Sequence, residues 1–174
     1  MSLSGRRVRE VSGRCEGLPP DGTAGIIAEN DAMRKVPAMV RQIVRDPIFL
    51  SQRSGTAVPA DKSIALDLLE TLAVNSDRCV GMAANMIGEA KRIIVFMDGR
   101  VPRVMFNPEI VHAEGEYETE EGCLSLTGTR HTKRYSRIRV RYQDERFARR
   151  VREYSGWTAQ IIQHEVDHCN GVLI

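Results

Sequence analysis

The sequence predicts an α+β fold in which a helix, several mostly antiparallel strands and a second helix follow one another. Three observations support this prediction. An apolar stripe with helical spacing follows residue 59, and several short β-branched runs bounded by turn residues come next. A second helical pattern then occupies the last part of the sequence.

The two helices are predicted from their start signals and apolar faces. The first begins at 59–61, where Pro and Asp open the pattern, and it places Leu68 and Leu72 on one face. The second has Thr158 as its expected N-cap and Gly171 as its stop.

The strands are predicted from β-branched runs and alternation. Residues 92–96 form one run, and 104–106 form a second that is expected to stop at the Asn-Pro pair 107–108. Apolar residues alternate with arginines through 138–142, as in a half-buried strand. A last strand is expected over 151–154.

Composition narrows the function classes. A chain of 174 residues with 42% hydrophobic residues is sufficient for one domain with its own core. A net charge of +2 argues against a dedicated, sequence-specific nucleic-acid binder. No apolar run approaches membrane-span length and no secretory signal is apparent, so we expect a cytoplasmic protein without membrane contact.

The chain is predicted to divide near residue 39. Residues 1–38 are rich in glycine and proline and are expected to form a partly disordered N-terminal extension. Residues 39–174 are expected to form the folded domain that carries the functional motifs.

The segment QHEVDH at 163–168 contains the strongest functional signal. His164 and His168 are four residues apart, so on a helix they project from one face and can bind one metal ion together. Glu165 lies beside them and can move protons for a bound water. The pattern favours metal-assisted hydrolysis.

A catalytic metal of this kind usually has three protein ligands and one open position. Cys123, in the segment EGCLS at 121–125, is the best candidate for the third ligand, because a thiolate binds borderline metals strongly. Gly122 permits a tight backbone path and close approach of a substrate. A purely structural site, which would need four ligands, is disfavoured.

Three segments together resemble the motifs of the peptide deformylase family. GMAANMIG at 81–88 resembles the first motif, Gly-x-Gly-Leu-Ala-Ala-x-Gln, while 121–125 and 163–168 match the second and third, Glu-Gly-Cys-Leu-Ser and Gln-His-Glu-x-Asp-His. The order and spacing also agree, and the resemblance covers about 40–174.

The resemblance implies a peptide deformylase-like fold with mostly antiparallel strands around a central metal-binding helix. It implies that Cys123, His164 and His168 hold one divalent metal, most often Fe(2+), with Zn(2+), Ni(2+) or Co(2+) as alternatives. The implied reaction removes the N-formyl group from nascent proteins and releases formate. Glu165 would carry the proton to the leaving amine, and the backbone N–H of Leu124 would stabilise the charged oxygen.

One position departs from the family pattern. Met86 stands where the first motif has glutamine, and a thioether cannot donate a hydrogen bond to the developing oxyanion. Cys79 likewise replaces the first glycine of that motif. Loss of one oxyanion donor typically costs on the order of 10²–10³ in rate, so weakened activity is expected.

The resemblance also implies that the substrate lies as an extended strand near Val80, Gly81 and Gly122, with its first side chain in an apolar pocket. Ile161 is a candidate wall of that pocket, with a plain core position as the alternative. Arg134 is expected to pair with Asp167 or another nearby acid and to brace the metal helix.

Two other functions remain open at this stage. An amide hydrolase for another N-acyl group would have its pocket reshaped around Met86, and a metal-bound formyl-peptide-binding protein would lack useful turnover. The arginine-rich stretch 130–152 suggests ribosome association, although a solvated strand face is the preferred interpretation because few aromatic residues accompany it.

Overall fold

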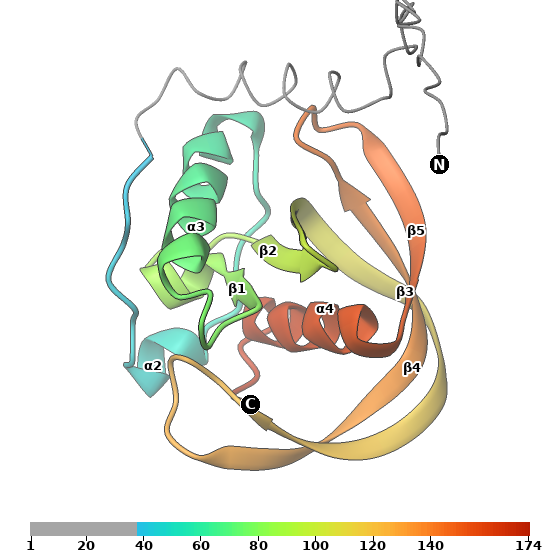
Figure 1. The fold of residues 1–174 in the computed structure, drawn as a ribbon. Coiled ribbons are helices and arrows are strands. Elements are labelled where there is room, and N and C mark those ends of the chain that lie inside the picture. Colours follow the sequence, from blue (N-terminus) through green and yellow to red (C-terminus); the bar gives the residue numbers. More distant parts are fainter. Residues whose placement is uncertain (1–37) are drawn as a thin grey trace, which may run out of the picture. The chain divides into compact units, whose positions relative to one another are not determined.

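The computed structural model describes residues 38–174, so residues 1–37 of the predicted extension lie outside the described part. The described residues form a five-stranded antiparallel sheet in the order β1-β2-β3-β4-β5, in which each strand pairs with the next (Figure 1). The predicted α+β class is confirmed. The strands are β1 Gly81–Ala83, β2 Ile93–Asp98, β3 Val101–Gly122, β4 Thr129–Gln143 and β5 Arg149–Ser155.

Five helical segments accompany this sheet, and no helix within 38–174 is long and apolar enough to cross a membrane. Two of them, α3 and α4, are longer than one turn, and both were predicted. The five are α2 Pro47–Leu50, the 3₁₀ turns η1 Pro59–Asp61 and η2 Ala84–Ile87, α3 Lys62–Val74 and α4 Gly156–Cys169.

The predicted N-cap of the last helix is wrong. Helix α4 begins at Gly156, and Ser155 occupies the N-cap position, so Thr158 lies inside the first turn. Strand β5 leads directly into the helix because Gly156 has a φ of 57°, a left-handed conformation that glycine adopts without strain. Gly171, with a φ of 76°, lies just beyond the end of the helix, as predicted.

Strand β2 is buried on both faces and separates two parts of the core. Ile93 and Val95 pack with the cluster that includes α3, whereas Ile94 and Phe96 pack with the cluster that includes α4. All four side chains are fully buried. This explains why the segment reads as a continuous apolar run instead of an alternating one, since successive side chains point to opposite faces.

The predicted stop at the Asn-Pro pair is also wrong, because β3 continues through it. The register between β3 and β4 shifts between Phe106 and Glu109, and Asn107 has a φ of 52°. Its side chain compensates by bonding the backbone of Ala57 twice, at 2.7 and 2.9 Å. The irregularity bends the strand without ending it, and the long β3–β4 hairpin curves around α4 (Figure 1).

Strand β1 lies at one edge of the sheet. Its three residues pair only with β2, so its second edge has no strand partner among residues 38–174. None of the strands predicted from the sequence includes these residues. The strand and η2 that follows it place the first motif beside α4 (Figure 1).

Candidate metal centre and cavity

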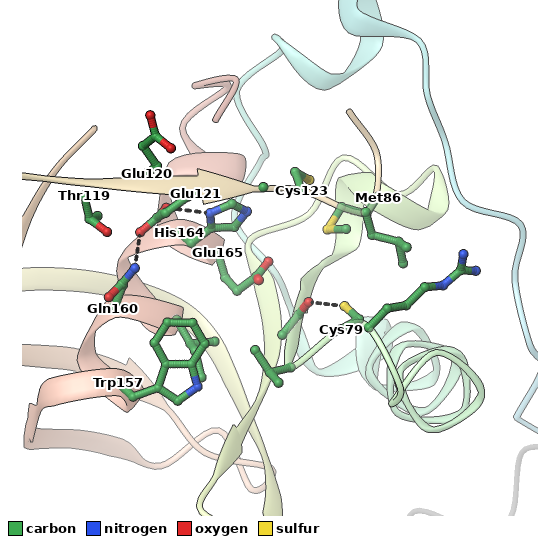
Figure 2. Close-up of a pocket in the computed structure, with 16 residues that line it drawn as sticks. Cys79, Met86, Thr119, Glu120, Glu121, Cys123, Trp157, Gln160, His164 and Glu165 are labelled. Atoms are coloured by element: carbon green, nitrogen blue, oxygen red, sulfur yellow. Dashed lines mark hydrogen bonds and ion pairs between the residues drawn. The ribbon is translucent and has the colours of Figure 1, made fainter. Parts of the chain in front are cut away.

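Helix α4 supplies one wall of a cavity of about 300 Å³. Residues three and four positions apart lie on one face of a helix, so the metal-binding pattern and the residues one and two turns before it form one stripe. Figure 2 shows this wall opposite the segment that contains Cys79 and Met86. The α4 residues in contact with the cavity are Trp157, Gln160, Ile161, His164 and Glu165.

The three predicted metal ligands come together in the structure. One ligand atom from each of Cys123, His164 and His168 lies within 4.8 Å of the other two. The Cys123 Sγ is 3.2 Å from His168 Nε2, and the backbone N–H of Ser125 donates to the same sulfur at 3.4 Å. A sulfur and two imidazole nitrogens form a donor set that suits zinc, iron, cobalt or nickel.

Glu121 orients the first histidine. Its Oε2 lies 2.8 Å from His164 Nδ1. Burial opposes its ionisation, but hydrogen bonds from His164 and Arg134 hold the pKa of Glu121 down at about 2. An ionised carboxylate only accepts hydrogen bonds, so the Nδ1–H donates and Nε2 is left as the ligand atom.

Arg134 connects this carboxylate to the metal helix. It donates to both oxygens of Glu121, at 2.9 and 2.7 Å, and to Asp167 at 2.7 Å. Its side chain is only 5% exposed. The predicted Arg134–Asp167 contact is therefore present, while the bidentate contact with Glu121 was not foreseen.

The pKa values differ sharply among the three residues of the helix: His164 holds a proton that a metal ion must displace from Nε2, His168 is neutral, and Glu165 titrates near neutral pH. Burial lowers the pKa of His164, but hydrogen bonds with Cys123 and Glu121 outweigh it and raise the pKa to about 10. Burial and the charge of His164 lower the pKa of His168 to about 3, so that imidazole is neutral, as a ligand must be. Burial raises the pKa of Glu165 to about 7, and its Oε2 has no hydrogen-bond partner within the described residues 38–174.

The predicted substrate-binding residues line the same cavity. Val80 and Gly81 lie on the β1 side, Gly122 and Leu124 flank Cys123, and Ile161 lies on α4. Ile161 is 5% exposed and also belongs to the core cluster that includes α4. It therefore both lines the cavity and packs in the core.

Gly81 packs against Glu165, the predicted proton carrier. A Cβ at this position would stand 2.6 Å from Ile161 Cγ2 and 2.7 Å from Glu165 Oε1. Real Cβ atoms essentially never approach so closely, so only glycine leaves Glu165 in its observed place.

The first-motif side of the cavity carries sulfur groups. Met86 is 1% exposed, and its Sδ accepts from the Ala83 N–H at 3.5 Å. The Cys79 thiol donates to the Gly81 carbonyl oxygen at 2.9 Å, and burial together with the charge of Glu165 raises its pKa to about 12. Asn85 donates to the His168 carbonyl oxygen at 2.8 Å, so its amide does not replace the missing glutamine.

On α4, sequence reasoning missed two cavity residues, Trp157 and Gln160. Both precede His164 on the same helical stripe, by seven and four residues, which is a signal that the sequence contains. His112 and His131 lie on the exposed sides of β3 and β4, with side chains 55% and 81% exposed, outside this site.

A family model described as polypeptide deformylase matches residues 40–174. The chain belongs to this family. Members of the polypeptide deformylase family are hydrolytic enzymes that use a single divalent metal, so this deformylase is a metallohydrolase. The expected family, fold and enzyme class are confirmed.

Individual deformylases are similar over most of the described chain. The peptide deformylase of Clostridium beijerinckii is 50% identical over 136 residues, which cover 78% of this chain and 100% of the relative. The solved deformylase of Thermotoga maritima has a TM-score of 0.69 and 33% identity, covering 79% of this chain and 95% of that one. A Met-Ala-Ser-bound deformylase from Acinetobacter baumannii has a TM-score of 0.71 and 25% identity, covering 78% and 97%.

Proposed function

We propose that this deformylase removes the N-formyl group from N-formylmethionyl peptides of nascent proteins, with Cys123, His164 and His168 as its metal ligands. The observation that carries the proposal is the meeting of these three side chains beside the unpartnered carboxylate oxygen of Glu165. Family membership supports the reaction class.

The metal site fits one divalent cation. The donor set leaves room for a fourth, non-protein ligand, which is the arrangement of catalytic rather than structural sites. A divalent metal there supplies Lewis acidity and lowers the pKa of a coordinated water. Fe(2+) is the metal we propose, as the family resemblance implies, with Zn(2+), Ni(2+) and Co(2+) able to occupy the same ligands.

Glu165 moves the proton in this proposal. Its pKa of about 7 allows the carboxylate to take a proton from the attacking water and to return it to the leaving amine at neutral pH. Gly81 keeps the path to this carboxylate open, because no side chain stands between them. The backbone N–H of Leu124, beside Cys123 in the cavity wall, is the proposed donor to the formyl oxygen.

The peptide is proposed to add to the free edge of β1. Backbone groups of Val80 and Gly81 on one side and of Gly122 on the other would bind the extended main chain. Ile161 would form the apolar wall against the first side chain. The Met-Ala-Ser-bound relative from Acinetobacter baumannii supports a short peptide as the ligand.

The rate is proposed to be lower than an intact first motif would give. Met86 accepts a hydrogen bond through its sulfur and has none to donate, so the oxyanion lacks one donor. This observation also supports the two other candidates, an amide hydrolase for another N-acyl group and a formyl-peptide-binding protein without turnover.

A nascent-chain substrate places the reaction in the cytoplasm. We do not propose ribosomal contact through the arginine-rich stretch 130–152, because exposed arginines of β4 pair with acidic residues of the same protein. Arg137 pairs with Glu114 at 2.8 Å, and Arg141 pairs with Glu109 at 2.6 Å. Such pairs are typical of a solvated strand face.

The test is metal analysis combined with formate release from formyl-Met-Ala-Ser, performed without oxygen. We expect one metal per chain, and we expect Glu165→Gln to keep the metal while losing about 10²–10⁴ of the rate. Acetyl-Met-Ala-Ser and longer acyl peptides serve as competing substrates. Faster release of another acyl group, or tight formyl-peptide binding without formate, would replace the proposal by the corresponding alternative.

A further inference from the structure

Gln160 links the cavity wall to the support of the metal ligand. It lies on α4, one turn before His164, and its side chain reaches back to β3. Its Nε2 donates to Glu121 Oε1 at 2.9 Å (Figure 2). Its Oε1 accepts from the Tyr117 hydroxyl at 2.9 Å. Tyr117 and Glu121 are four residues apart on β3, so they lie on the same face of that strand.

The Glu121 carboxylate is thereby held at both oxygens from α4 as well as from Arg134. Oε1 accepts from Gln160 and from Arg134, and Oε2 accepts from His164 and from Arg134. Residues one helical turn apart thus bind the two oxygens of one carboxylate. Without the Gln160 contact, Arg134 is the only hydrogen-bond partner of Oε1 among residues 38–174.

The hydrogen bond from Gln160 to Glu121 is made in a buried environment. The Glu121 side chain is 6% exposed, so water is a poor substitute for a lost partner. Burial, followed by the charge of Glu121, raises the pKa of Tyr117, which keeps its hydroxyl protonated and able to donate. The hydrogen bonds therefore run in one direction: Tyr117 donates to Gln160, and Gln160 donates to the Glu121 carboxylate that orients His164. We call these three residues the Tyr117–Gln160–Glu121 relay.

We propose that Gln160, held by Tyr117, is a positioning residue that fixes Glu121 and through it the metal-binding orientation of His164. It acts through Glu121 and need not touch the reacting atoms. The inference rests on the proposed metal ligands, but not on turnover of any particular substrate. Partners of this kind behind a ligating histidine commonly change metal affinity by about 10–100-fold when they are lost.

The test measures metal release from the Ni(II)-loaded protein to a coloured chelator, with no substrate present. Gln160→Met keeps the length of the side chain and removes both hydrogen bonds, and we expect release to be about tenfold faster. Gln160→Glu places a second carboxylate against Glu121 and should release the metal faster still. Gln52→Met, an exposed glutamine outside the site, is the matched control and should behave as wild type.

A double-variant cycle separates a relay from general loosening of the fold. Tyr117→Phe alone should accelerate release by a smaller factor than Gln160→Met. In the Gln160→Met background it should add nothing, because its only route to Glu121 is already gone. Wild-type release from Gln160→Met, or a full additional effect of Tyr117→Phe in the double variant, would overturn the proposal.

The rate of metal release tests the role of Gln160 independently of the proposed deformylation reaction. Metal release is measured without turnover, so a protein that binds Ni(II) but releases no formate would refute the deformylation proposal alone. Normal deformylation with equal metal release from all variants would refute the role of Gln160 alone.

Discussion

The two sides of the cavity are built from different chemistry. On the metal side, the side chains of Arg134, Gln160 and His164 all bond the carboxylate of Glu121. On the first-motif side, Cys79 and Met86 bond only neighbouring backbone groups through their sulfur atoms. One side is a network of charge-assisted hydrogen bonds, whereas the other has no strong side-chain donor at the position of the family glutamine.

Because the two sides use different residues, metal binding and transition-state stabilisation should depend on separate parts of the cavity. A protein can hold its metal with full strength and still lack one donor to the substrate oxygen. Variants on the metal side should therefore affect metal retention and folding, while variants on the first-motif side should affect the rate alone.

The largest effect is expected from breaking the metal side at Arg134. Arg134→Ala removes the arginine from the buried carboxylate of Glu121 and the partly buried carboxylate of Asp167, which should lower the free energy of unfolding by about 3–5 kcal/mol. Denaturant unfolding measures this change, and metal content should fall with it. Arg139→Ala on the same strand, where the side chain is 53% exposed, is the control and should stay within about 0.5 kcal/mol of wild type. Equal stability of the two variants would contradict a bracing role.

The second largest effect is expected on the first-motif side of the cavity, at Met86. Met86→Gln restores an amide donor at a position that lines the cavity, so formate release should rise by up to about 10²–10³-fold with metal content unchanged. Met86→Leu, which adds no donor, should give no gain. A parent protein of full activity that Met86→Gln fails to improve would show that the oxyanion argument is wrong.

A somewhat smaller effect is expected at Gly81, where β1 packs against Ile161 and Glu165 of α4. Gly81→Ala drives its Cβ into Ile161 and Glu165, and a displaced proton carrier should lower kcat/KM by about 10²-fold. Gly55→Ala is the matched control, since its added Cβ would meet only the Ala90 carbonyl oxygen at 3.7 Å. A loss of activity that is the same in both variants would remove the argument from close contact.

The smallest expected effect is acid destabilisation through Glu121. Its pKa is lowered from 4.5 to about 2, so the stabilisation is complete above pH 4.5 and is lost as the pH falls towards 2. Between pH 7 and pH 3 the metal-free protein should lose about 2 kcal/mol through this group. Urea midpoints across that range measure the loss, and Glu121→Gln should show a shallower decline. Parallel declines in both proteins would contradict this source of pH dependence.

Much of the metal site could be predicted from local sequence. His164, Glu165 and His168 share a helical face because of their spacing alone, and the motif around Cys123 supplied the third ligand. Both longer helices and parts of the strands β2, β3, β4 and β5 also followed from periodicity, whereas β1 did not. The strand through Asn107 and the start of α4 at Gly156 were predicted wrongly, because a bulge and a left-handed glycine override the usual stop and cap signals.

By itself, the sequence determined the absence of an amide donor at Met86 and was sufficient to propose the ligand set and the proton carrier, since these depend on residue type and on spacing within one helix or one motif. Only the tertiary structure decided that Tyr117, Gln160 and Arg134 converge on Glu121. These contacts join β3, β4 and α4 across the fold, and their distances depend on how the bent hairpin wraps the helix. Hydrogen bonds between distant segments require positions within a few tenths of an ångström, which no periodicity encodes.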